Sequence, residues 1–246
     1  MRKNTYIGIA FIVLVFGIIV IPKIFKRLAN DDVTRGGRMH VVQGKAENNP
    51  NELAYVMNNG EERKVPPFTF INQDKDTITN TTFKGKVYLV EFFFTRCPGI
   101  CIPMNQNLIH IAEQFKGEDK FGIASFSITP EYDTPAVLKA YADGYGITHP
   151  NWHFLTGNLT DVFELSNTGF SLLADAEAGL ENQFYHSGYF ALVDQNGFLR
   201  SRKDASGKNP IVFYKGSVLQ DAVLEETESP AQVHELIADI NHLLKK

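Results

Sequence analysis

The stretch Val87-Tyr-Leu-Val-Glu-Phe-Phe-Phe94, continued by Thr95-Arg-Cys-Pro-Gly-Ile-Cys101, decides how this chain folds. Its first half is almost continuously apolar, which is typical of a central strand covered on both faces. Behind its second half, apolar residues from Met104 to Phe115 recur at helical spacing and predict a helix. The only cysteines of the chain, Cys97 and Cys101, therefore lie at a strand-to-helix junction, where backbone N–H groups and the helix dipole favour thiolate.

Further elements are predicted on both sides of this junction. Their ranges are strands at 68–71, 76–78, 121–128 and 152–156 and helices at 135–145 and 159–166. A run over 183–193, an Asn196-Gly197 turn and a second run over 198–202 predict a hairpin. Ser229-Pro230 predicts a capping box at the start of a last helix that ends near Leu244. This order of elements predicts an α/β sandwich around a mixed sheet.

Composition limits the classes of function. The chain has 246 residues, of which 43% are hydrophobic and 12% aromatic, so it can bury a packed core. A net charge of −4 leaves no basic surface for nucleic acid, and we expect no nucleic-acid partner. Two cysteines are too few for a disulfide scaffold but sufficient for one site.

The N-terminal segment predicts a membrane anchor. The chain carries no charge from Asn4 to Pro22, and it is almost wholly apolar over 6–21, which is about the length that spans a bilayer. No small-residue cleavage site follows, as it would in a signal peptide. We therefore expect a short tail over 1–5, an uncleaved transmembrane anchor over 6–25, a linker over 26–65 and a globular domain over 66–246.

The side of the membrane is less simple to predict. Lys23, Lys26 and Arg27 behind the anchor outnumber Arg2 and Lys3 before it, so the positive-inside rule favours a cytoplasmic domain. The thiol chemistry described next points to an extracytoplasmic domain instead. We give that chemistry more weight.

The cysteine pair admits several uses. Residues at positions i and i+4 return to the same side of a helical turn, so both sulfurs can face one point. Such a pair can exchange disulfides or hold a soft metal ion, and the plainer alternatives are a surface staple or two unrelated buried thiols. Met104 lies close by, but its place in the apolar stripe makes it a core residue rather than a ligand.

A histidine is the commonest partner for such thiols in a metal site. Of seven histidines, His186 stands out because Tyr185 and Tyr189 flank it just before the hairpin and indicate a partly buried position. The others have ordinary interpretations as linker, loop or solvated helix residues: His40, His110, His149, His153, His234 and His242.

Three segments together resemble the Sco/SenC family. They are Phe93-Phe-Thr-Arg-Cys-Pro-Gly-Ile-Cys101, Ser127-Ile-Thr-Pro-Glu-Tyr-Asp-Thr-Pro135, and His186-Ser187 followed by Leu192-Val-Asp-Gln-Asn-Gly197. The resemblance covers about residues 66–244 and implies a thioredoxin-like mixed sheet flanked by helices, behind one N-terminal transmembrane helix. It also implies that Cys97, Cys101 and His186 bind copper, with Asp133 as a supporting residue. The expected ion is Cu(I), and binding of Cu(II) is left open.

The same resemblance implies a copper chaperone for the binuclear copper centre of cytochrome c oxidase. Such a protein would deliver copper to the copper-bearing subunit of the oxidase, or reduce its cysteines, on the periplasmic side of a bacterial inner membrane. Other copper chaperones or thiol reductants are further expected partners. We expect a metallochaperone rather than an enzyme.

Other functions remain open at this point. In a membrane-tethered thiol–disulfide oxidoreductase, Cys97 would attack and Cys101 would resolve, although the familiar motif has two intervening residues rather than three. A one-cysteine peroxidase fits less well, and a redox or metal sensor has the same sequence signature as a chaperone. The chain also departs from the family pattern: Ile102 replaces a usual proline, Thr129 replaces a usual aspartate, and the segment 201–228 is longer than the family needs.

Overall fold

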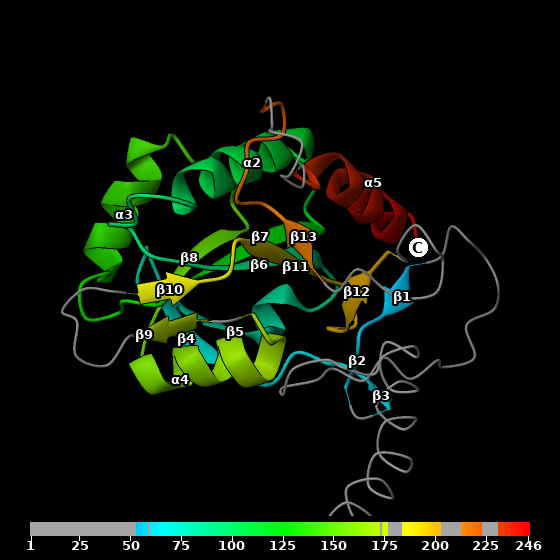
Figure 1. Cartoon of the computed structure of the whole chain (residues 1–246), viewed down its shortest axis with the longest axis horizontal. Coiled ribbons are helices and arrows are strands. Elements are labelled where there is room, and N and C mark those ends of the chain that lie inside the picture. The colour runs from blue at the N-terminus through cyan, green and yellow to red at the C-terminus, as the bar shows by residue number, and fades with distance from the viewer. Residues whose placement is uncertain (1–52, 59, 173, 177–183, 203–212, 223–230) are drawn as a thin grey trace, which may run out of the picture. The chain divides into compact units, whose positions relative to one another are not determined.

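The computed structural model describes residues 53–58, 60–172, 174–176, 184–202, 213–222 and 231–246 (Figure 1). The chain divides into two units, Met1–His40 and Val41–Lys246, and all described residues belong to the second. The predicted tail, the anchor over 6–25 and most of the linker lie outside the described residues. Among the helices that are described, none is both long and apolar enough to cross a membrane.

One mixed sheet forms the centre of the second unit. Its strands are β1 (Ala54–Tyr55), β4 (Thr69–Asn72), β5 (Thr77–Thr79), β6 (Val87–Phe93), β7 (Phe121–Ser127), β8 (Trp152–Thr156), β11 (Tyr189–Val193), β12 (Leu199–Ser201) and β13 (Tyr214–Lys215). The order is β1-β12-β11-β6-β7-β8-β4-β5, with β13 paired to β11. Strands β6, β7 and β8 run parallel, whereas β11 and β4 join them antiparallel. The predicted mixed sheet is confirmed.

Two short hairpins lie outside this sheet. One pairs β2 (Met57–Asn58) with β3 (Glu61–Glu62), and the other pairs β9 (Ala174–Ala176) with β10 (Phe184–His186). The predicted run over 183–193 is divided in the structure, because β10 lies outside the central sheet and the chain joins that sheet only at β11. The Asn196-Gly197 turn between β11 and β12 is confirmed, and Gly197 adopts the left-handed φ of +83° that such a turn requires.

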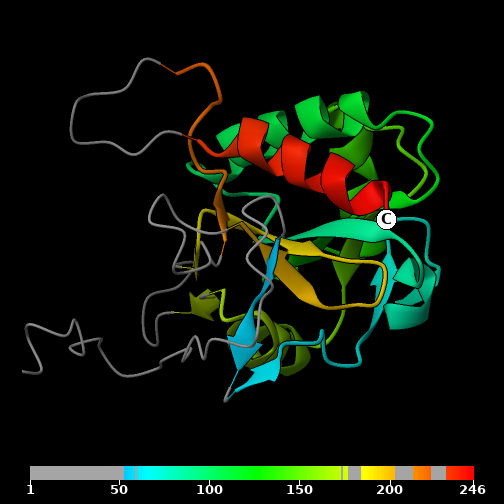
Figure 2. The ribbon, with the colours of Figure 1, turned by 90° about the vertical axis from the view of Figure 1, so that its right-hand side faces the viewer.

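Strand β6 is buried along its whole length, as its apolar sequence predicts. Helices α2 (Cys101–Gln114), α3 (Pro135–Gly144) and α5 (Val233–Leu244) cover one face of the sheet, and α4 (Leu159–Glu164) lies on the other (Figures 1 and 2). The predicted apolar stripe of α2 packs into the core on the first face. Aromatic rings fill the opposite side, where Phe92 stacks on Phe126 and meets Phe170 edge-on. Residues 94–100 connect β6 to α2, and we name them the cysteine loop. Because both faces of the sheet are covered, the carboxyl end of β6 is held firmly where this loop begins.

The helix ends follow local signals in two cases and depart from them in two. Thr134 caps α3, with Pro135 at its first turn, and Asn158 caps α4. The predicted helix over 159–166 instead passes into a π-helical turn, η2 (Leu165–Phe170). Ser229 and Pro230 of the predicted capping box lie outside the described residues, and α5 begins at Val233, later than predicted.

The folded domain begins before Pro66. Strand β1 pairs with β12, and Leu53 is buried in the core. The side chain of Arg200 donates to the carbonyl oxygen of Leu53 at 2.6 Å and forms a buried ion pair with Asp194 at 2.9 Å. The last residues of the expected linker therefore belong to the sheet, and the expected boundary at residue 66 was too late.

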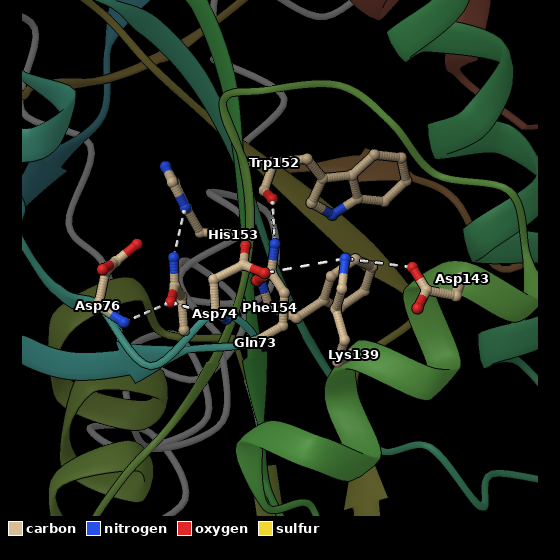
Figure 3. A network of polar contacts seen from close by, with 9 residues as sticks. Gln73, Asp74, Asp76, Lys139, Asp143, Trp152, His153 and Phe154 are labelled. Carbon is tan, nitrogen blue, oxygen red and sulfur yellow. Dashed lines mark hydrogen bonds and ion pairs between the residues drawn. The ribbon is translucent and has the colours of Figure 1, made fainter.

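The turn between β4 and β5 ties the sheet to helix α3 (Figure 3). Gln73 bonds to the backbone of β8 on both sides, to the carbonyl of Trp152 and the N–H of Phe154. Lys139 of α3 lies between Asp74 and Asp143, at 3.8 and 3.2 Å. The ion pairs of Lys139 are exposed and the hydrogen bonds of Gln73 are partly buried, so we regard these contacts as a structural link between the edge of the sheet and α3.

Candidate metal centre

The two cysteines lie at the connection between strand β6 and helix α2. Cys97 is half-buried in the connecting loop, and its N–H donates to the carbonyl of Phe94 at 3.2 Å. Cys101 is the first residue of α2 and is only 2% exposed. Both thiols are free. The predicted strand-to-helix junction is therefore confirmed, with one accessible sulfur and one covered sulfur.

Strand β10 brings His186 to the same place. The Nε2 atom of His186 lies 2.9 Å from the sulfur of Cys101 and 3.9 Å from the sulfur of Cys97, and the histidine is 9% exposed. The three donor atoms all lie within 4.8 Å of one another, as one metal ion requires. Sequence position indicated a partly buried His186, and the structure adds that it faces both cysteines.

The imidazole of His186 has a fixed orientation. Its Nδ1 lies 3.2 Å from the carbonyl oxygen of Ser187, and because a carbonyl only accepts, Nδ1 carries the proton of that bond. The ring of Phe94 meets the imidazole edge-on at 5.9 Å. These two contacts leave Nε2 as the ring nitrogen that faces the sulfurs, which is the usual arrangement for a metal-binding histidine.

The two thiols differ strongly in acidity. Hydrogen bonding from Cys101, supported by His186 and by backbone N–H groups, lowers the pKa of Cys97 to about 4 against its ordinary value of 9.0. The pKa of Cys101 is raised, because it shares a hydrogen bond with the Cys97 sulfur and is buried. At neutral pH the pair therefore consists of a thiolate at Cys97 and a thiol at Cys101.

Asp133 organises the backbone beneath the cysteine loop. It is fully buried, and its carboxylate accepts hydrogen bonds from the N–H and hydroxyl of Thr95 and from the hydroxyls of Ser127 and Thr129. These bonds join the residue two positions before Cys97 to the end of β7. Thr129, which replaces a usual aspartate of the family, donates to Asp133 at 3.0 Å. A hydroxyl there satisfies the carboxylate, whereas a second carboxylate would repel it.

The structure adds a residue that the sequence reasoning missed. Glu91 lies within β6, is 1% exposed, and accepts from the hydroxyl of Ser125 at 2.7 Å. Its Oε2 has no hydrogen-bond partner among the described residues. Burial raises the pKa of Glu91 to about 7. The signal in the sequence was a single charged residue inside an apolar strand.

The other histidines lie apart from this centre. Among the described residues, only Cys97, Cys101 and His186 form a group of potential metal ligands. His110 and His234 are exposed, as predicted, whereas His242 is half-buried. His153 contacts Asn72, and His40 lies outside the described residues. Met104 is fully buried in the core, so its predicted packing role is confirmed.

Two thiol sulfurs and one imidazole nitrogen form a soft donor set. Thiolate and imidazole ligands suit Cu(I) and also Zn²⁺, whereas hard cations such as Mg²⁺ prefer oxygen. A thiol pair of unequal acidity can also exchange disulfides. Together with the mixed sheet, this site defines the class: a thiol-based redox or metal-binding protein with a thioredoxin-like fold.

Comparison with known proteins identifies the family within that class. A family model described as SCO1/SenC matches residues 56–214, so the chain belongs to the SCO1/SenC family. The chain is 36% identical over 146 residues to the SCO1 protein homolog of Bacillus subtilis, a match that covers 58% of this chain and 74% of that one. It is 30% identical over 142 residues to a Stutzerimonas stutzeri protein whose name describes copper binding, with 56% and 68% of the two chains covered.

Solved structures agree with the fold. A SCO1/SenC family lipoprotein from Bacillus anthracis aligns with a TM-score of 0.60 and 29% identity, covering 74% of this chain and 95% of that one. A second similar structure is that of BsSco, which is described as a member of the Sco family of cytochrome c oxidase assembly proteins and as having a disulfide switch. It aligns with a TM-score of 0.55 and 28% identity, over 73% and 92% of the two chains. The predicted thioredoxin-like fold is therefore confirmed.

Proposed function

We propose that this chain binds copper through Cys97, Cys101 and His186. The observation that carries the proposal is the convergence of two sulfurs and one imidazole nitrogen within 4.8 Å. The depressed pKa of Cys97 supplies one thiolate without cost at neutral pH, and copper binding releases the proton of Cys101. Membership of the family and the name of the S. stutzeri relative support copper rather than zinc.

Copper binding by this site suits a role in delivery. Cys97 is the more accessible ligand, so an acceptor can replace it first and take the ion by ligand exchange. We propose that the acceptor is the copper-bearing subunit of cytochrome c oxidase, as the description of BsSco supports. The chain would act from the predicted anchor over 6–25, with its domain on the periplasmic side of a bacterial inner membrane.

Titration of the full-length chain with Cu(I) in detergent, under reducing conditions and with a competing chelator, tests the first step. We expect one equivalent to bind to the native chain and none to bind tightly after Cys97→Ser or Cys101→Ser. Unchanged affinity in either variant would overturn the ligand assignment. The same titration with Cu(II) asks whether the oxidised ion is also held.

Delivery and membrane side need separate experiments. Copper-loaded chain mixed with the copper-free soluble domain of the oxidase subunit should lose its ion to that domain. No transfer over hours would count against delivery. For the membrane side, a fusion reporter at the C-terminus that is active only in the cytoplasm should stay silent.

A second function is favoured by the arrangement of the two thiols, in which a half-buried Cys97 lies beside a buried Cys101 that lowers the pKa of Cys97 to about 4. In a thiol–disulfide exchange, the Cys97 thiolate attacks a partner's disulfide and forms a mixed disulfide, and one partner sulfur leaves as a thiol. Cys101 then attacks Cys97, so that the partner leaves as a dithiol and the chain keeps the disulfide. Two electrons pass to the partner. Of the two protons on its new thiols, one comes from Cys101 and the other from water, because Cys97 reacts as a thiolate. Rapid turnover of a disulfide substrate by copper-free chain, unchanged in His186→Ala, would favour this function over copper delivery.

A further inference from the structure

His186 depends on a segment that is distant from it in sequence. Strand β10, which carries it, pairs with β9 and stands outside the central sheet. Its link to the sheet passes through Ser187 and Gly188, directly before β11. A histidine on such a separate hairpin keeps its place opposite Cys101 only if something holds that link.

The residues that hold the link come from Tyr214–Gln220, which we name the brace. The N–H groups of Gly216 and Ser217 both donate to the carbonyl oxygen of Gly188, at 2.9 and 3.1 Å. The contact is very close, because a Cβ atom added to Gly188 would lie 2.3 Å from the Cβ of Ser217. Only glycine at position 188 lets the two backbones meet in this way.

The brace is fixed in turn by the helix that carries Cys101. Asn107 lies on α2 and is 3% exposed, and its Nδ2 donates to the carbonyl oxygens of Gly216 at 3.0 Å and Val218 at 2.7 Å. Its Oδ1 accepts from the N–H of Gln220 at 3.2 Å. Both polar atoms of the Asn107 amide, Nδ2 and Oδ1, are therefore bonded to the brace. These bonds offset the free-energy cost of burying the amide, which would be high without partners.

The other side of the brace is tied to the core. Gln232, just before α5, exchanges two hydrogen bonds with the backbone of Lys215, at 2.9 and 3.0 Å. The hydroxyl of Tyr214 donates to Asp239 of α5 at 2.7 Å. Gly216 lies against the ring of Phe190, where a Cβ atom would come within 2.2 Å. The brace is thus held from α2, α5 and β11 and can act as a rigid support.

We propose that Asn107 and Gly188 are positioning residues which, through the brace, hold His186 opposite Cys101. A path of contacts runs from Cys101 along α2 to Asn107, across the brace to Gly188 and on to His186. The brace lies within the segment 201–228, for which the sequence offered no role. The inference rests on the proposed function, because it assigns these residues to the geometry of the same copper site.

Three variants of the full-length chain test it. Gly188→Ala adds a methyl group that collides with Ser217, and Gly188→Ala/Ser217→Gly removes the collision. Asn107→Asp keeps the size of the side chain but takes away both donors. Gln106→Ala, at an exposed position next to Asn107 on the same helix, is the matched control.

We expect Gly188→Ala and Asn107→Asp to weaken Cu(I) binding about tenfold or more, the loss typical of removing a residue that orients a metal ligand. X-ray absorption should then show the nitrogen ligand lost and both sulfurs kept. Ser217→Gly should restore the affinity and the nitrogen ligand in the Gly188→Ala background. Wild-type affinity and a retained nitrogen ligand in either single variant would overturn the proposal, as would absence of rescue.

Hydrogen exchange on the metal-free chain gives an independent reading. The amides of Gly216 and Ser217 should be protected in the native chain and in Gln106→Ala, and exposed in Asn107→Asp. If they exchange freely in the native chain, no brace exists, whatever the variants do. If instead His186→Ala binds copper as the native chain does, the proposed ligand set fails while the exchange data still decide on the brace.

Discussion

The Nε2 atom of His186 lies 2.9 Å from the sulfur of Cys101, although 85 positions separate them in the chain. This contact completes a site that the cysteines alone leave open. Mutating a residue that only hydrogen-bonds to a metal ligand typically lowers metal affinity roughly 10- to 100-fold. Because His186→Ala removes a ligand itself, we predict that it lowers Cu(I) affinity by at least that factor. Competition titration measures the change. His110→Ala, an exposed histidine on α2, should bind copper as the native chain does.

The parts of this fold that could be predicted from the sequence depend on neighbours along the chain. Strand β6 follows from an unbroken apolar run, helix α2 from its stripe, and the β11–β12 turn from Asn196-Gly197. Each signal lies within a few residues, so periodicity and turn chemistry suffice. The cysteine pair was found for the same reason.

What could not be predicted depends on contacts between distant segments. Strand β1 is too short to recognise by pattern, and it forms because β12 and the side chain of Arg200 receive it. The position of β10 depends on Gly188 meeting Ser217, which no local signal in either segment indicates. The start of α5 depends on Gln232 bonding to Lys215. Resemblance to a family supplied His186 as a ligand, because its spacing from the cysteines carries no information by itself.

The acidity of Cys97 gives a pH prediction. Since its pKa is about 4 in the folded chain, it is a thiolate over the whole neutral range. Its alkylation rate with iodoacetamide should stay constant from pH 8 down to about 6 and reach half near pH 4. In urea the rate should fall about tenfold per pH unit below the ordinary thiol pKa.

Cys101 is the main cause of this acidity, which provides a control. In Cys101→Ala the largest hydrogen bond to the Cys97 sulfur is gone, so the pKa of Cys97 should rise. The alkylation rate should then decline already between pH 8 and 6. A rate that stays flat in that variant would show that Cys101 does not stabilise the thiolate.

Asp133 is predicted to stabilise both the fold and the site. Asp133→Ala leaves the buried donors of Thr95, Ser127 and Thr129 without their acceptor, at a cost of about 1–3 kcal/mol or more. Because Thr95 lies in the cysteine loop, two positions before Cys97, copper affinity should fall as well. Guanidinium unfolding and copper titration measure the two effects. Asp143→Ala removes an exposed partner of Lys139 and should cost at most about 1 kcal/mol, with no change in copper affinity.

The start of the folded domain can be tested by truncation. A chain that begins at Pro66 lacks β1 and the buried side chains of Leu53, Val56 and Met57. It also leaves Arg200 without the carbonyl oxygen of Leu53. Each lost apolar side chain contributes about 1.5–3 kcal/mol, so this chain should be less stable by several kcal/mol than one that begins at Val41. Equal midpoints of guanidinium unfolding would place the boundary at residue 66 after all.

Glu91 predicts how stability depends on pH. In the folded chain its pKa is about 7, against an ordinary value of 4.5. Between these pH values the folded chain holds a proton that the unfolded chain has released, so the free energy of unfolding falls as pH rises, by about 3 kcal/mol across the window. Glu91→Gln keeps the shape but cannot titrate, and its stability relative to the native chain should therefore rise by that amount from pH 4.5 to 7. Glu61→Gln changes an exposed residue, so its free energy of unfolding should depend on pH as that of the native chain does. If the stability difference between the native and Glu91→Gln chains stays constant from pH 4.5 to 7, the raised pKa of Glu91 is contradicted.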